Sequence, residues 1–90
     1  MEAKISIERR PQVEQRCGWS TSTLYSYMAR GLFPPQVRIS KRAVGWLAHE
    51  VDAVLQGRVR GLDDIAVKLL VADLVADRLA DKPAGKRADR

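Results

Sequence analysis

The sequence contains one cysteine and one histidine among 90 residues, and these shortages exclude two kinds of site. Cys17 has no second cysteine for an internal disulfide, and no basic, apolar leader opens the chain, so we expect a cytoplasmic protein. His49 has no cysteine or histidine at metal-ligand spacing, so no metal site is predicted and His49 is expected on the surface. Cys17 lacks a neighbouring base and is expected to fill space in a turn.

Motifs typical of enzymes are absent as well. The sequence has no phosphate-binding loop, no paired catalytic carboxylates and no nucleophile elbow, and a chain of this length has a thin core with little room for a pocket. The most apolar stretch, residues 65–80, is interrupted by four charges, which is too many for a membrane span. We therefore expect neither an enzyme nor a membrane protein, and no cofactor.

Positive charge is in excess, and it is unevenly placed. Lysine and arginine number 16 against 11 aspartate and glutamate, which gives a net charge of +5. Residues 1–61 carry ten basic and five acidic side chains, whereas residues 62–80 carry two basic and four acidic ones. A basic domain favours a polyanionic partner, with nucleic acid the first candidate and an acidic membrane surface the second.

Residues 11–31 predict two short helices joined by a tight turn. Pro11 suits the first position of a helix that runs to Cys17, and Gly18 supplies the left-handed backbone that the turn needs. Ser20 is a good N-cap for the second helix, which Gly31 ends. The inner face of that second helix is formed by residues at helical spacing: Leu24, Tyr27 and Met28. This pattern is a helix-turn-helix.

Short strands are predicted on both sides of this motif. Ile5 and Ile7 alternate with polar residues, which indicates a short strand or extended arm, and residues 37–40 and 43–46 read as a hairpin around a basic turn. A third amphipathic helix is expected from about Leu47 to Gln56, followed by a linker over residues 57–61. The expected fold is mainly α with a small β-hairpin: a winged helix-turn-helix over residues 1–61, with a C-terminal helix.

The predicted C-terminal helix, residues 62–80, has apolar residues on two sides. Asp63 and Asp64 suit its first turn and Arg78 its last. One stripe contains Leu62, Ile65, Leu69, Ala72, Ala76 and Leu79, and the other contains Val67, Val71, Leu74 and Val75. A 90-residue chain covers one such face, so we interpret the other as a contact with a second subunit. Residues 81–90 are expected to form a disordered basic tail.

The candidate binding residues follow from these elements. The outward face of the second helix would enter the major groove, and the basic turn would hold the DNA backbone or a minor groove. The candidate DNA-binding residues are Arg9, Arg10, Ser20, Thr21, Ser22, Thr23, Tyr25, Ser26, Arg30, Arg38, Lys41 and Arg42. The candidate self-association residues are Leu62, Ile65, Val67, Leu69, Val71, Leu74 and Val75. The alternatives are an ordinary helical hairpin and a solvated basic turn; Trp19 and Trp46 are expected in the core.

Three segments together resemble the AlpA-type phage regulators: residues 10–25, residues 28–34 with Gly-Leu-Phe-Pro, and residues 42–53 with Ala-Val-Gly-Trp. The resemblance covers about residues 7–58. It implies a winged helix of the group that includes MerR-type domains and phage excisionases, with residues 21–30 as recognition helix and residues 38–43 as wing. Arg16 and Trp19 stand where aliphatic residues are usual in that family.

The leading hypothesis is an excisionase, or recombination directionality factor, that binds attachment-site DNA cooperatively and directs an integrase toward excision. The alternative is a transcriptional regulator that binds promoters as a closed dimer. A third hypothesis is a protein-binding adaptor that uses the apolar C-terminal helix. The expected partners are double-stranded DNA, a further copy of the chain and an integrase.

Overall fold

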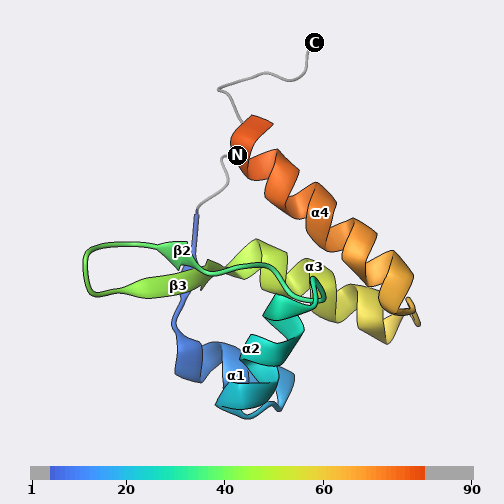
Figure 1. Ribbon diagram of the computed structural model, residues 1–90, viewed down its shortest axis with the longest axis horizontal. Coiled ribbons are helices and arrows are strands. Elements are labelled where there is room, and N and C mark those ends of the chain that lie inside the picture. Colours follow the sequence, from blue (N-terminus) through green and yellow to red (C-terminus); the bar gives the residue numbers. More distant parts are fainter. Residues whose placement is uncertain (1–4, 81–90) are drawn as a thin grey trace.

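The computed structural model describes residues 5–80 and has four helices and three short strands in that range. The elements, in chain order, are β1 (Ile7–Glu8), α1 (Arg10–Cys17), α2 (Thr21–Ala29), β2 (Val37–Arg38), β3 (Val44–Leu47), α3 (Ala48–Val59) and α4 (Asp64–Ala80). Figure 1 shows α1 and α2 side by side below the sheet, the β2–β3 hairpin projecting to the left, and α4 along the opposite side. The mainly helical fold with a basic hairpin is confirmed.

The helix-turn-helix forms as the sequence predicts. Gly18 ends α1 with φ 72° and ψ 29°, a left-handed conformation in which its backbone N–H donates to the carbonyl of Glu14 at 2.8 Å. The hydroxyl of Ser20 accepts a hydrogen bond from the backbone N–H of Thr23 at 3.2 Å, which caps α2. Gly31, with φ 77°, follows the end of α2. These backbone contacts fix the angle between α1 and α2.

The hairpin is part of a three-stranded antiparallel sheet with the order β1-β3-β2. The register aligns Ile7 with Leu47 on one side of β3 and Val37 with Gly45 on the other. Gly45 is required at the centre, because a Cβ there would lie 2.8 Å from the backbone oxygen of Glu8. The N-terminal segment therefore forms a strand that fastens the wing to the body of the domain.

Helix α3 differs from its expected bounds. It begins at Ala48, because Leu47 is still paired in β3, and it continues to Val59 instead of ending near Gln56. Gly57, expected in a linker, is buried inside the helix, where a Cβ would lie 2.9 Å from Leu62 Cδ1. The absence of a side chain at Gly57 lets the start of the last segment pack directly on α3.

Helix α4 begins at Asp64, two residues later than expected, because the carboxylate of Asp63 caps it by accepting from the backbone N–H of Ala66 at 2.9 Å. Its two apolar faces have different surroundings. Val67 and Val71 are buried in the same core as Val51 and Val54 of α3, whereas Ile65 and Leu69 are 72% and 64% exposed. Val67 and Val71 are thus covered within the chain, and Leu74 and Val75 are half-buried against its core. Of the candidate self-association residues, the exposed ones are Leu62, Ile65 and Leu69.

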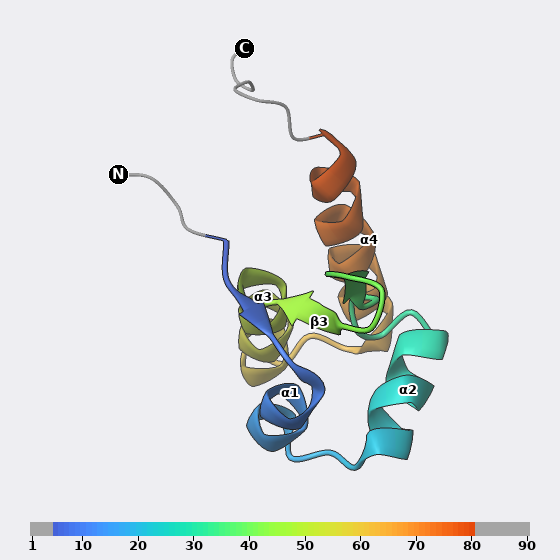
Figure 2. The ribbon, with the colours of Figure 1, turned by 90° about the vertical axis from the view of Figure 1, so that its left-hand side faces the viewer.

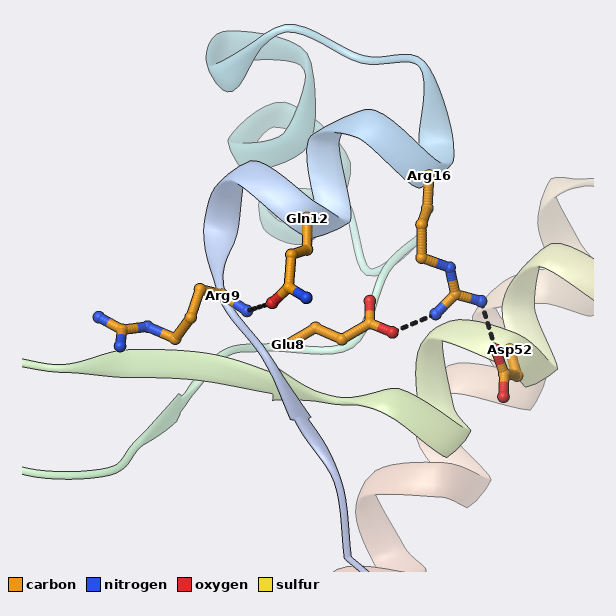
Figure 3. Close-up of polar contacts among 5 residues, drawn as sticks. All are labelled: Glu8, Arg9, Gln12, Arg16 and Asp52. Atoms are coloured by element: carbon orange, nitrogen blue, oxygen red, sulfur yellow. Dashed lines mark hydrogen bonds and ion pairs between the residues drawn. The ribbon is translucent and has the colours of Figure 1, made fainter.

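Two arginines join elements that are distant in sequence. Arg16 of α1 donates to Glu8 of β1 at 2.5 Å and to Asp52 of α3, as Figure 3 shows. Arg78 of α4 donates to both carboxylate oxygens of Glu50 of α3, at 2.5 and 2.8 Å, and to the carbonyl oxygen of Pro35 at 2.8 Å. Glu50 is fully buried, so the Arg78 pair neutralises a charge inside the molecule.

Both tryptophans pack in or against the core, as expected. Trp46 is fully buried, and the ring centroid of Trp19 lies 4.4 Å from that of Tyr27 and 5.4 Å from that of Phe33. His49 is exposed, also as expected. Among the described residues no helix is long and apolar enough to cross a membrane. The expected tail, residues 81–90, lies outside the described part of the chain.

Candidate nucleic-acid interface

Helix α2 presents a polar outer face. Leu24 is buried and Tyr27 and Met28 are half-buried against the core, so the opposite side of the helix faces solvent. The exposed candidate residues on α2 and at its two ends are Ser20, Thr21, Ser22, Tyr25, Ser26 and Arg30, while Thr23 is half-buried. In Figure 2, α1, α2 and the tip of the wing lie on the side toward the viewer, and α4 lies above α2 with its first turns farther back.

The hydroxyls at the start of α2 are partly engaged within the chain. Thr21 donates to the Oε2 atom of Glu14 at 2.6 Å, and the Ser20 hydroxyl contacts those of Thr23 at 3.0 Å and Ser22 at 3.4 Å. These contacts stabilise the turn and the cap. The side chains further along the outward face, Tyr25, Ser26 and Arg30, make no such hydrogen bond among the described residues, although the Arg30 guanidinium lies 5.1 Å from the Tyr27 ring centroid.

A basic groove lies between α2 and the wing. It encloses about 260 Å³ and is lined by Arg9, Arg10, Pro11, Tyr25, Arg42 and Val44, with no carboxylate among these six residues. Arg9 donates from Nε to the carbonyl oxygen of Val44 at 3.1 Å, and Figure 3 shows its guanidinium extended along β3, away from Glu8. Arg42 follows Arg9 and Arg10 by more than 30 residues in sequence, and the fold brings all three to one place beside Tyr25.

Two further candidate cations, Arg38 and Lys41, lie on the wing together with Arg42. Arg38 ends β2 and donates from Nη1 to the carbonyl oxygen of Lys41 at 3.2 Å, which orders the turn between the strands. The backbone N–H of Ile39 donates to the carbonyl oxygen of Ala43 at 2.8 Å and closes the hairpin. Arg38, Lys41 and Arg42 are all exposed. The wing tip thus carries three positive charges on a backbone held by hydrogen bonds.

Sequence reasoning missed the residues that position these cations. Glu14 pairs with Arg10 at 3.2 Å and accepts from Thr21, so one carboxylate connects the basic groove with the start of α2. The spacing of four residues between Arg10 and Glu14 on one helix is a signal that could have shown the first contact. The contact of Arg9 with the Val44 carbonyl depends on the fold, and no local pattern indicates it.

Residues 5–80 contain no group of three histidine, cysteine or carboxylate side chains placed to hold a metal ion. Burial raises the pKa of the Cys17 thiol, and this outweighs the opposite effect of the Arg16 charge nearby. Asp52, followed by Glu8, raises the pKa of Arg16, so its guanidinium is charged in the bridge between α1, β1 and α3.

A helix-turn-helix, a third helix behind it and a basic hairpin beside its second helix define a winged helix-turn-helix domain. Residues 6–59 match the family model described as prophage CP4-57 regulatory protein (AlpA), which is more than half of the chain. The chain belongs to the AlpA family. The match covers the sheet and α1 to α3, and α4 lies beyond it.

The chain is similar to the protein ORF88 of enterobacteria phage P4, described as uncharacterized, with 45% identity over 53 residues. The matched part is 59% of this chain, and it spans 60% of the length of that relative. No solved structure matches the chain.

Proposed function

We propose that this chain is a sequence-specific double-stranded DNA-binding protein of a mobile element. The observation that carries this proposal is the groove in which Arg9, Arg10 and Arg42 surround Tyr25 on the outer face of α2. Three guanidiniums line the groove. Arg10 is paired with Glu14 of its own helix at 3.2 Å, whereas Arg9 and Arg42 make no ion pair among the described residues, and the bidentate geometry of arginine suits phosphate oxygens. The groove lies between two elements that reach DNA in winged helices, so it suits a backbone phosphate between their contacts.

In the proposed complex α2 enters the major groove. Its outward side chains Tyr25, Ser26 and Arg30 would face base edges, because Leu24 and Tyr27 hold the opposite side against the core. The wing, with Arg38 and Lys41, would follow the adjacent backbone or minor groove. Ser20, Thr21 and Thr23 support the recognition helix from within the chain, so we propose that sequence reading rests mainly on the side chains further along α2.

For its biological role we propose an excisionase, or recombination directionality factor, that binds several sites near an attachment site and directs an integrase toward excision. Membership of a family described as prophage regulatory supports a role in a mobile element. The exposed stripe of α4 supports cooperation between copies, because Ile65, Leu69 and Leu79 are 72%, 64% and 85% exposed. No catalytic step is proposed for this chain.

A second candidate role is a transcriptional regulator that binds a promoter as a closed dimer. The observation that favours it is the single continuous apolar stripe on α4, because a self-complementary patch is what a two-fold interface uses. A purely protein-binding adaptor is the third reading, and specific DNA binding with an arginine dependence excludes it.

Arg42 offers a direct test of DNA binding. R42A removes one of the three guanidiniums in the groove, so we expect weaker binding to a specific site. The slope of the logarithm of the association constant against the logarithm of salt concentration should become smaller by about 0.9, which corresponds to the loss of one phosphate contact. Gel shifts or fluorescence anisotropy over a range of salt concentrations measure both quantities. R60A is the matched control, since Arg60 is exposed at the end of α3 and does not line the groove.

Equal effects of R42A and R60A would contradict the proposed interface. Footprinting across an attachment region, with excision scored in parallel, separates the two roles. Protection that promotes excision supports the excisionase, whereas protection at a promoter without any effect on excision supports the regulator.

A further inference from the structure

The exposed stripe of α4 has a regular spacing along the whole helix. Within the helix the stripe consists of Ile65, Leu69, Ala72, Ala76 and Leu79, which follow one another at intervals of four, three, four and three residues. This alternation is the heptad spacing of a coiled coil, with residues 65, 72 and 79 at the d positions and residues 69 and 76 at the a positions. From residue 65 to residue 79 the stripe is about 21 Å long.

Helix α4 is held so that this stripe faces away from the body of the protein. Val67 and Val71, on the opposite side of the helix, are 0% and 6% exposed and belong to the core. Asp64 near its start pairs with Arg58 at 3.0 Å, and Arg78 near its end pairs with Glu50. Contacts at both ends and in the middle therefore fix the rotation of α4, and a second molecule finds the stripe already in place.

The charges beside the stripe distinguish between the parallel and the antiparallel orientation of a second copy. With the heptad assigned as above, Lys68 falls at a g position and Asp73 at the following e position, and both side chains are exposed. In a parallel coiled coil a g residue faces the e residue five positions later on the other helix, so Lys68 of each chain would face Asp73 of its partner. In the antiparallel pairing that places residue 65 opposite residue 76, Lys68 would face Val75 and Asp73 would face Ala66, and no opposite charges would meet.

We propose that two copies of this chain associate through a parallel pairing of their α4 helices, with residues 65, 69, 72, 76 and 79 at the seam and two Lys68–Asp73 ion pairs beside it. A parallel pair has a two-fold axis along the seam, so the two DNA-binding faces are related by two-fold symmetry. Given the proposed DNA binding, on which this part rests, the dimer is matched to inverted half-sites rather than to direct repeats, and it is the closed dimer named above for the second candidate role.

The seam is short and contains two alanines, so the free dimer is weak. A seam of five residues per helix is small beside stable protein interfaces, which bury at least about 1,000 Å². Two half-sites on one DNA molecule hold the chains close together and raise their effective concentration, which strengthens the pairing without any new contact. Association of the free protein is therefore best measured at high concentration.

Charge exchange on the full chain tests the orientation. In sedimentation equilibrium the parent chain forms dimers, and K68E or D73K weakens the dimer because each change places like charges opposite one another. The double variant K68E/D73K restores the pairs with their signs exchanged, and we expect it to regain at least half of the lost dimer. D77K is the matched control, because Asp77 lies on the same helix outside the positions that flank the seam, and we expect its dimer to equal that of the parent chain.

A disulfide provides a second measurement of orientation. Ile65→Cys in a Cys17→Ser background places the two new sulfur atoms in one layer of a parallel seam, so mild oxidation gives a covalent dimer. In the antiparallel pairing each residue 65 lies opposite residue 76, about 16 Å along the helix from its counterpart, and no such bond forms. L69E, which places a charge in the seam, should give a folded monomer with an unchanged circular dichroism spectrum.

Several outcomes would overturn the pairing: a monomer at all concentrations, a double variant no better than the single ones, or absence of the covalent dimer. Binding to an isolated half-site is measured separately with the L69E variant. If L69E still binds one half-site, the proposed DNA binding stands whatever the result for the dimer. If the parent chain does not bind DNA at all, that result counts against the proposed DNA binding and not against the dimer.

Discussion

Arg16 illustrates how a single side chain replaces packing with charge in this domain. Related sequences are expected to have an aliphatic residue here, whereas Arg16 contacts Glu8 and Asp52 and so connects α1, β1 and α3. Its partner carboxylates are partly solvated, and ion pairs of this kind contribute about 1 kcal/mol or less each. The pairing therefore serves mainly to orient α1, from whose first residues the basic groove is built.

Cys17 provides a prediction at the same scale. Because burial raises the pKa of its thiol in the folded chain, the unfolded chain loses that proton at a lower pH. Cys17 therefore contributes stability that is fully present below the pKa of the unfolded thiol and is lost as the pH rises toward the folded value. Rates of iodoacetamide labelling against pH, with and without urea, give both midpoints.

We expect the labelling midpoint of the native chain to lie above that of the chain in urea. Cys17→Ser is the control for stability, since its free energy of unfolding should fall less than that of the parent chain as the pH rises above 9.0, the ordinary pKa of the thiol. A native midpoint equal to or below the unfolded one would contradict the effect of burial.

At the scale of the elements, the attachment of α4 depends on one buried ion pair as well as on apolar contacts. Glu50 of α3 is fully buried, and Arg78 satisfies both of its oxygens. Removing one partner leaves an uncompensated charge in the core, whereas replacing both partners with apolar residues removes the charge altogether. Single substitutions in this pair should therefore lower the free energy of unfolding much more than the double substitution does.

R78M should destabilise the domain by about 3–5 kcal/mol, because it leaves the Glu50 carboxylate buried without a cation. The double variant E50M/R78M should recover most of that loss. Urea unfolding followed by circular dichroism measures each free energy. The double variant could instead lose as much free energy of unfolding as R78M and E50M together. That result would show that the destabilisation in R78M does not come from an uncompensated charge on Glu50.

At the scale of the whole molecule, the charges are separated between two sides. Arg9, Arg10 and Arg42 surround the groove beside α2, while α4 with its acidic residues lies on the side away from the wing tip (Figure 1). The two proposed interfaces, one for DNA and one for a second copy, therefore lie on different faces of the molecule. Removal of α4 by truncation after Gly61 would expose Val51 and Val54, so surface substitutions are the cleaner test of self-association.

Salt provides the prediction for the whole molecule. If about four phosphates are neutralised by the groove and the wing, the logarithm of the association constant should fall with the logarithm of salt concentration at a slope of about −3.6. Titrations of a specific site between low and moderate salt measure the slope. A flat response would exclude a complex held by the basic face, and a random-sequence duplex of the same length gives the nonspecific reference.

The local signals predicted most of the fold, because helix caps and turns depend on residues close in sequence. Gly18 and Gly31 have the left-handed backbone expected at the ends of α1 and α2, and the Ser20 side chain caps α2 as expected. The spacing of apolar residues predicted α2 and α4 and the faces that they present. The candidate interface was predicted in its parts for the same reason: the polar side of α2 and the basic turn are each readable from a few neighbouring residues.

What the sequence alone determined is therefore the set of elements and the excess of positive charge; what the tertiary structure decided is which distant residues meet. Periodicity gave two apolar faces on α4 but not which one packs on α3, because that depends on the shape of the partner surface, where Gly57 leaves room for Leu62 and Leu70. In the same way the gathering of Arg9, Arg10 and Arg42 depends on the pairing of β1 with β3, a contact between segments almost 40 residues apart.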